Sequence, residues 1–236
     1  EAITVFNQNG SIKVIGDSGG TSVSLSAVPF AFADNQDDGT AAITDVQSTI
    51  KIDQSQSGAI AVKCSVAISD HNSAKNGTTG CELTVHVPST WTSGSQSGLA
   101  FTAHAQNGPA TVQGITMADN TSPTGYVKSD NGDVTVSVNG SCVAHSANGT
   151  VSATIVPDKG STVEASSDNG DVTLGLPAGF SADKLTLSAS GGSVTIGSGF
   201  TNTFTESSTS VGTAGTGAAS VTATTGLGNV TVTPSG

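Results

Sequence analysis

The chain has 236 residues, a net charge of −11 and no arginine, and only 11% of its residues are charged. An average globular domain carries about 25% charged residues, so this surface must be polar but largely uncharged. Clustered Lys and Arg are needed to bind nucleic acid or anionic membranes, and the composition excludes both kinds of partner.

The sequence begins at Glu1, without Met and without a basic and apolar leader. We interpret this as an exported protein whose signal peptide has been removed. No apolar run reaches the roughly 18 residues that a bilayer-spanning helix needs. We therefore expect an extracellular or cell-surface location, with no insertion into a membrane.

In the first half of the chain, 1–124, strands are predicted at irregular intervals. The segments 7–16 and 55–66 alternate apolar and polar residues, which is typical of half-buried strands. An apolar insertion at 27–40 separates them, and a longer loop is expected at 69–80. We interpret this half as solenoid rungs with longer loops.

From about residue 125 to 236 the spacing becomes a repeat. SDNGDVTVSV (129–138), SSDNGDVTLGL (166–176) and SGGSVTIGSG (190–199) align, and GLGNVTVTPSG (226–236) follows as a fourth unit. Two short strands in every twenty residues or so predict an all-β, single-stranded β-solenoid, a β-helix-like stack of short rungs forming one continuous domain over 1–236. A β-sandwich is the alternative. The predicted strand centres are Val134, Val151, Val172, Val194, Val211 and Val230, interleaved with Val143, Val163, Leu185, Phe204 and Val221.

Tight turns punctuate these strands. Seven of the thirteen asparagines precede glycine, and Asn-Gly accepts the positive φ angles of a two-residue turn. We predict equivalent corners, with Val134, Val172 and Val194 stacked inside. The only candidate helix is a weak one at 178–186. The predicted structural turn residues are Asn131, Gly132, Asn169, Gly170, Gly191 and Gly192.

These repeats resemble a bacterial adhesin-like domain family of unknown function that occurs in cell-envelope proteins. The resemblance rests on AITVFNQNGSIKVIG at the start, CELTVHVPSTW (81–91), the SDNGDVTV units and LGLPAGFSADKLTLSASGGSVTIGSG (174–199). It implies a β-solenoid exported to the envelope. It implies no catalytic residues.

Two kinds of enzyme are alternatives to a non-enzymatic β-solenoid. The segment 16–20, GDSGG, matches the sequence around a trypsin-like nucleophile, but Ser18 precedes the candidate base His104, against the order of that family. A glycan-active β-helix enzyme, a glycosidase or polysaccharide lyase, is the stronger alternative. It needs paired carboxylates in a cleft, and the recurring Asp residues occupy turn positions instead. We therefore predict no enzyme activity and no cofactor.

Other candidate sites are few. The segment 34–38 is rich in oxygen ligands and is a weak calcium candidate, but it misses the EF-hand spacing, so a solvated acidic loop is the default. Cys64 and Cys81 lie on neighbouring predicted strands, and a disulfide between them is as plausible as two free thiols. The state of Cys142 stays open. The calcium candidates are Asp34, Asn35, Asp37 and Asp38.

The sequence therefore predicts a non-enzymatic structural or adhesive protein of the cell surface. We expect it to associate with itself, as a fibre or lattice subunit, or to bind other cell-envelope components, glycans among them. Neither terminal segment, AITVF or GLGNVTVTPSG, carries the lysines that protect an exposed strand edge. We therefore expect one terminal strand to pair with a neighbouring subunit.

Overall fold

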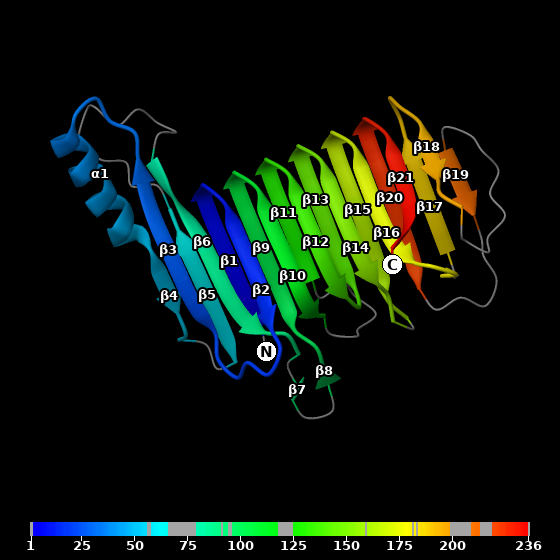
Figure 1. The fold of residues 1–236 in the computed structure, drawn as a ribbon, viewed down its shortest axis with the longest axis horizontal. Helices are drawn as coiled ribbons and strands as arrows, with labels where there is room; N and C mark the ends of the chain where they lie inside the picture. The colour runs from blue at the N-terminus through cyan, green and yellow to red at the C-terminus, as the bar shows by residue number, and fades with distance from the viewer. Residues whose placement is uncertain are drawn as a thin grey trace.

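The computed structural model contains two long sheets that face each other across a narrow core, with helix α1 at one end (Figure 1). It describes residues 2–55, 58–65, 79–90, 92–93, 96–117, 125–158, 160–180, 182, 184–198, 209–212 and 219–235. Within these residues, no helix has the length and apolar character needed to cross a bilayer.

Within the described residues, sheet A has ten strands and sheet B has nine. In spatial order, sheet A consists of β19 (Thr209–Gly212), β17 (Lys184–Ala189), β20 (Ser220–Leu227), β15 (Thr162–Asn169), β13 (Cys142–Asn148), β11 (Gly125–Asn131), β9 (Ala100–Asn107), β1 (Ala2–Asn9), β5 (Ala59–Cys64) and β4 (Lys51–Asp53). Sheet B consists of β18 (Val194–Ile196), β21 (Val230–Ser235), β16 (Val172–Pro177), β14 (Val151–Val156), β12 (Val134–Asn139), β10 (Ala110–Thr116), β2 (Ile12–Asp17), β6 (Thr79–Pro88) and β3 (Ser24–Ala31). A small hairpin, β7 (Thr92–Ser93) and β8 (Gln96–Ser97), lies outside both sheets.

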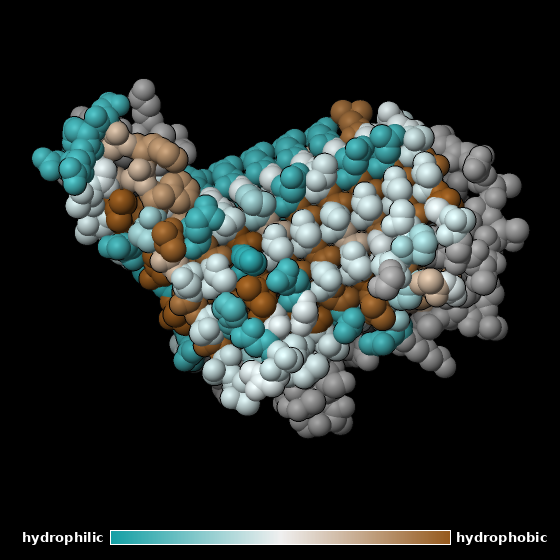
Figure 2. All heavy atoms as spheres, in the orientation of Figure 1, coloured by the Kyte–Doolittle hydropathy of each residue, from teal (hydrophilic) through white to brown (hydrophobic). Residues whose placement is uncertain are grey.

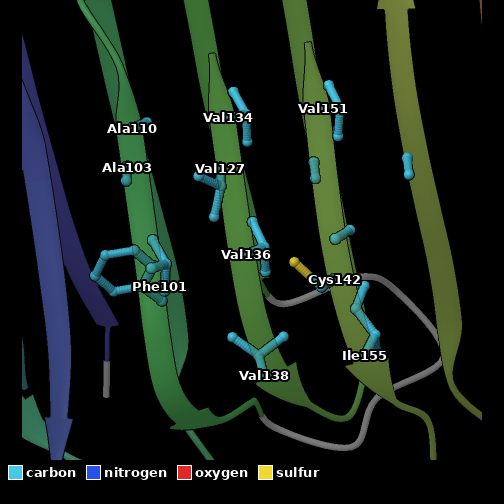
Figure 3. Packing of buried hydrophobic residues seen from close by; sticks show 14 of the residues in the cluster. Phe101, Ala103, Ala110, Val127, Val134, Val136, Val138, Cys142, Val151 and Ile155 are labelled. Carbon is cyan, nitrogen blue, oxygen red and sulfur yellow. The ribbon is translucent and has the colours of Figure 1, made fainter. Parts of the chain in front are cut away.

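Each regular rung is one strand of sheet A, a tight turn and one strand of sheet B. Rungs stack in parallel, so equivalent residues form columns. Alternate residues point inward, as in β12, where Val134, Val136 and Val138 are buried while the residues between them are exposed. Figure 3 shows these side chains meeting Val127 of sheet A across the core. Small and branched residues suffice because the sheets are close together. This architecture confirms the predicted β-solenoid.

The predicted column of valines is also confirmed, with a change of order. Val134, Val172 and Val194 share one column, but Val230 lies between Val172 and Val194. The prediction for Val211 is wrong, because β19 runs antiparallel to β17 in sheet A and does not belong to the sheet B series. The predicted centre at Phe204 lies outside the described residues.

The terminal strands are not the ends of the stack. β1 pairs with both β5 and β9, and β21 pairs with both β16 and β18. The expectation that AITVF or GLGNVTVTPSG offers an open edge is therefore wrong, because each is covered on both sides within the chain. The outermost strands are instead β3 and β4 at one end and β18 and β19 at the other.

Helix α1 (Gln36–Thr49) closes the end formed by β3 and β4, and the sequence reading missed it. Its sequence contains Gly39 and several β-branched residues, which are poor helix formers. Tertiary packing outweighs that propensity, since Ala42 and Val46 are buried, and Val46 belongs to the main core. The weak helix prediction at 178–186 is wrong, because β17 begins at Lys184.

Candidate functional site

An asparagine ladder runs along the edge where rungs turn from sheet A to sheet B. Each side-chain amide donates from Nδ2 to the Oδ1 of the next rung's asparagine, at 2.8 to 3.1 Å. Asn9 ends the ladder by donating to the carbonyl of Thr79. A line of strongly hydrophilic residues along the upper edge in Figure 2 marks this corner. The ladder consists of Asn9, Asn107, Asn131, Asn148 and Asn169.

Buried hydroxyl groups stabilise the same corner by hydrogen bonds on its core side. Two residues before the ladder position, Ser129, Ser146 and Ser167 each donate to a glycine carbonyl of the neighbouring turn, at 2.8 Å. Thr225 does the same to the carbonyl of Gly170. A buried carbonyl without such a partner would destabilise the fold. The S-x-N-G repeat therefore encodes the stacking of rungs, and not a catalytic site.

The predicted turn residues occupy these corners. Asn131, Gly132, Asn169 and Gly170 belong to the ladder and its glycine column, where a Cβ at Gly170 would lie 2.2 Å from the carbonyl oxygen of Gly149. Gly192 lies in the same column, since a Cβ there would lie 1.9 Å from the carbonyl oxygen of Gly228. Gly191 precedes it, beside Leu227. Glycine is required by this close approach of backbones.

In the rung of β5 and β6, a disulfide joins Cys64 to Cys81. The Cα atoms lie 6.7 Å apart, and the sequence separation is 17 residues. Asn7 donates from Nδ2 to the carbonyl of Cys81, so the bridge lies beside the ladder. Cys142 is a free, buried cysteine, and burial raises the pKa of its thiol to about 12.

The outer face of sheet A carries a row of cationic, imidazole and aromatic side chains. Six adjacent strands, from β4 to β13, place one member each at the same register position. The row holds five of the eleven lysines and histidines in the chain (seven Lys and four His). We call it the sheet A row, and its members are Lys51, Lys63, Phe6, His104, Lys128 and His145.

Contacts link the members of the row. The Lys63 ammonium lies 5.7 Å from the centre of the Phe6 ring, and Phe6 meets the His104 ring edge to face at 5.4 Å. Asp130, in the next register position, accepts from Lys128 at 2.7 Å and contacts His104 at 2.9 Å. Burial opposes ionisation of Asp130, but these hydrogen bonds outweigh it, so the pKa of Asp130 lies below its ordinary value.

At its β4 end the row borders a hollow of about 350 Å³ between sheet A and the end of α1. Lys51 and Lys63 line it, directly opposite each other, together with Ser48, Thr49 and Ser65. Like charges in this position repel each other. Within the described residues neither lysine forms an ion pair, so both ammonium groups are available to a partner.

The outer face of sheet B is different in kind, because hydroxyl groups dominate it. One register position across the sheet carries eight hydroxyl side chains and one lysine. Neighbouring strands in a sheet lie about 4.8 Å apart, so these groups form a regular array. The row consists of Ser26, Thr84, Lys13, Thr111, Thr135, Ser152, Thr173, Thr231 and Thr195.

The structure does not assemble the protease-like motif. His104 lies in sheet A against Asp130, whereas Asp17 is the last residue of β2 in sheet B and Ser18 follows it. Asp17 instead contacts His86 at 3.1 Å, a pair formed between adjacent strands. No described contact joins Ser18 to either histidine.

The weak calcium candidates form the start of α1. Asn35 is the N-cap residue, and its side chain accepts from the backbone N–H of Asp38 at 2.9 Å. Asp37 and Asp38 occupy the first turn, where a negative charge stabilises a helix. Asp34 lies just before the cap. A helix start therefore accounts for this cluster, and the described residues contain no group of His, Cys, Asp and Glu arranged to hold a metal.

Comparison with known proteins agrees with the fold. The sequence profile named Toastrack DUF4097 matches residues 101–233, more than half of the chain. The chain belongs to this family. The match confirms the resemblance to a family of unknown function that the SDNGDVTV units indicated. No curated protein matches the chain.

Two solved structures are similar to it. A "putative cell adhesion protein" from Clostridium sporogenes is 11% identical with a TM-score of 0.46, over 99% of this chain and 92% of the other. A "putative adhesin" from Bacteroides fragilis is 14% identical with a TM-score of 0.44, over 98% and 91%. At these values neither similarity carries a conclusion about function.

Proposed function

We propose that this Toastrack protein is a non-enzymatic, exported protein of the cell surface, and that the sheet A row is its contact surface for a cell-envelope component. One observation carries the proposal. In a chain with a net charge of −11, cationic and imidazole groups from five strands lie in one line on the outer face of sheet A, beside the aromatic ring that a sixth strand contributes. Lys51 and Lys63 oppose each other there without an acidic partner among the described residues.

The rigid stack supports this role. The asparagine ladder and the buried hydroxyls fix the register of successive rungs, so the row keeps its spacing without a bound partner. Such preorganisation lowers the entropic cost of binding. We further propose that 1–236 forms one continuous solenoid domain.

The glycan-active enzyme is the rival function. Its chemistry needs two carboxylates beside the substrate. The hollow at Lys51 and Lys63 is lined by no described carboxylate, which favours binding over cleavage. We accordingly expect a serine-directed fluorophosphonate to leave Ser18 unlabelled. Labelling of that residue would contradict the non-enzymatic proposal.

The experiment is retention of the purified protein on cell-envelope preparations, with two matched double variants. Lys63→Gln with His104→Gln removes two of the five basic side chains of the sheet A row. Lys13→Gln with His86→Gln makes the same chemical change on the outer face of sheet B. We expect the first pair to weaken retention at least about fivefold, the equivalent of about 1 kcal/mol, and the second to leave it unchanged. Equal effects of both pairs would contradict the assignment to sheet A.

Self-association remains part of the proposal, but at a different edge from the one that the sequence suggested. β3 is the outermost strand of sheet B and carries no charged residue. Val28 is 59% exposed on it and Phe32, just beyond it, is 71% exposed, with the Phe30 ring 6.0 Å from the Phe32 ring. Helix α1 packs against β3, so we propose that a second copy covers the exposed apolar side chains of Val28 and Phe32 and does not extend the sheet by strand pairing.

Sedimentation over a range of concentrations tests this edge. Val28→Lys should shift the protein toward the monomer, because a charge interrupts the exposed apolar patch that Val28 forms with Phe32. Thr111→Lys, an outward position in the middle of sheet B, is the matched control and should leave association unchanged. A wild-type protein that stays monomeric at every concentration would refute self-association.

A further inference from the structure

A second hollow, of about 320 Å³, lies on the outer face of sheet B at the edge opposite the asparagine ladder. It lies where β10, β12 and β14 end (Figure 1). Small-molecule sites span roughly 300–1,000 Å³, so this hollow matches the lower end of that range. Its polar lining comes from Ser89, Thr116, Ser137, Asn139 and Thr154, and its exposed apolar lining from Val156.

A β-bulge creates the hollow. The pairing of β10 with β12 shifts register between Gln113 and Ile115, which leaves Gly114 as an extra residue. Gly114 has φ +71°, and its carbonyl oxygen would lie 1.9 Å from a Cβ at Gly16. The two glycines therefore let the strands approach while leaving an outward position without a side chain. Bulges of this kind often occur beside functional sites.

The polar groups of the hollow are unused by the fold. Among the described residues, the side chains of Ser137, Asn139 and Thr154 form no hydrogen bond, and all three are exposed. The ladder asparagines differ sharply, since each gives its amide to a neighbouring rung. Asn139 also precedes glycine, yet it lines the hollow. The sheet thus fixes the backbone positions that carry these donors and acceptors, while the groups themselves have no internal partners among the described residues.

The chemistry of the lining selects a neutral, hydroxyl-rich ligand. None of the described lining residues is ionisable. Hydroxyl and amide groups both donate and accept, as sugar hydroxyls do. Val156, 45% exposed, offers an apolar surface to the C–H groups of a ring. We infer that this hollow binds a neutral sugar unit of a glycan. The inference concerns the face opposite the sheet A row and goes beyond the proposed function.

Matched double variants on the same two strands test it. Ser137→Ala with Thr154→Val removes two hydroxyls from the hollow. Thr135→Val with Ser152→Ala removes the same two kinds of hydroxyl from β12 and β14, two residues earlier and outside it. The probes are the neutral trisaccharides maltotriose, cellotriose, mannotriose and tri-N-acetylchitotriose, with trigalacturonic acid as the anionic comparison. Binding is measured by saturation-transfer NMR and titration calorimetry.

We expect at least one neutral trisaccharide to bind. The variant of the hollow should weaken that binding at least about fivefold, as the loss of two hydrogen bonds implies. The control variant should bind as the wild type does. Equal weakening in both variants, binding of trigalacturonic acid alone, or no binding of any probe would overturn the inference. None of these outcomes bears on retention through the sheet A row, so the two proposals fail separately.

Discussion

The chain passes between the two sheets along two edges, and the connections are uniform at one edge and variable at the other. At the ladder edge five rungs use the same two-residue turn, with an asparagine amide hydrogen-bonded to a neighbouring rung. The rung of β20 and β21 keeps the turn but has Leu227 in place of the asparagine. At the opposite edge the strands are joined across 116–125, 139–142, 156–162 and 177–184, so the connections differ in length. The neutral hollow lies at this second edge.

The difference shows how a solenoid can keep one structure while its surface varies. Register is fixed once per rung, at the ladder edge, and a slip of one residue would turn buried valines outward. The other edge carries no such constraint and accepts insertions. Binding groups can therefore accumulate there without loss of the stack.

Removing the disulfide should produce the largest effect on stability. The rung of β5 and β6 closes its ladder edge with Cys64–Cys81 across a separation of 17 residues, in place of a tight turn. A loop of this length implies a loss of about 3 kcal/mol in the free energy of unfolding. Denaturant unfolding of Cys64→Ala with Cys81→Ala measures it.

Wild-type protein unfolded in reductant is the control that separates the bond from the lost sulfur atoms. Cys142 should stay unlabelled by thiol reagents in the folded state, since its thiol is buried and its pKa is raised to about 12. An unchanged unfolding midpoint in the double variant would show that this rung needs no covalent closure.

Adding a side chain to the glycine column should have the second largest effect on stability. A Cβ at Gly149 would lie 2.4 Å from the carbonyl oxygen of Gly132, which also accepts from the buried Ser146 hydroxyl. We expect Gly149→Ala to lower the free energy of unfolding by about 2–3 kcal/mol, as overpacking does. Gly179→Ala, at the variable edge, meets no atom within 4 Å and should cost only about 1 kcal/mol, from its φ of +73°. Equal losses in the free energy of unfolding for the two variants would contradict the proposed difference between the edges.

Asn139 and Asn148 each precede a glycine, but they lie at opposite edges, so they allow a direct comparison of the two edges. Asn148 donates to Asn131 and accepts from Asn169, whereas the amide of Asn139 has no partner among the described residues. Asn148→Ala should destabilise the protein by about 1 kcal/mol, and Asn139→Ala by less than about 0.5 kcal/mol. Thermal unfolding of the two variants side by side provides the measurement. A larger loss from Asn139→Ala would contradict the ladder's structural role.

The smallest effect concerns pH and Asp130. Its pKa is lowered in the folded protein from the ordinary value of 3.8, so its stabilising contribution is present above about pH 4 and is lost as pH falls through the folded pKa. Asp130→Asn should lower stability at pH 7 by about 0.5 kcal/mol, as for an exposed ion pair, and by less at pH 3. Asp168→Asn, 65% exposed and 4.0 Å from His145, should show almost no difference. A pH-independent effect of Asp130→Asn would refute this account.

The sequence was sufficient for the repeat and its corners, because Asn, Gly and the flanking valines recur at fixed offsets. It was insufficient for the ends of the stack. SGGSVTIGSG and GLGNVTVTPSG fit a rung equally well, so nothing local shows that β21 lies inside β18. Helix α1 was missed because only Ala42 and Val46 are buried on it.

The sheet A row was also missed, because its members come from six strands that are far apart in sequence. Recognising it requires the register of every rung. The outward phase of His104 on its strand was the one available signal, and by itself it did not reveal the neighbouring lysines.

The nested position of the last rung has a consequence for how the chain acquires its fold. β20 and β21 lie between β15–β16 and β17–β18, both of which are synthesised earlier. If those earlier rungs packed together first, they would exclude the strands that belong between them. β1 and β2 likewise can pair only after β5–β6 on one side and β9–β10 on the other have been synthesised. Folding in order of synthesis cannot build this stack, and long-range pairing of this kind is slow. A polypeptide that pairs late stays extended for longer before its rungs close, a property that fits the export proposed above.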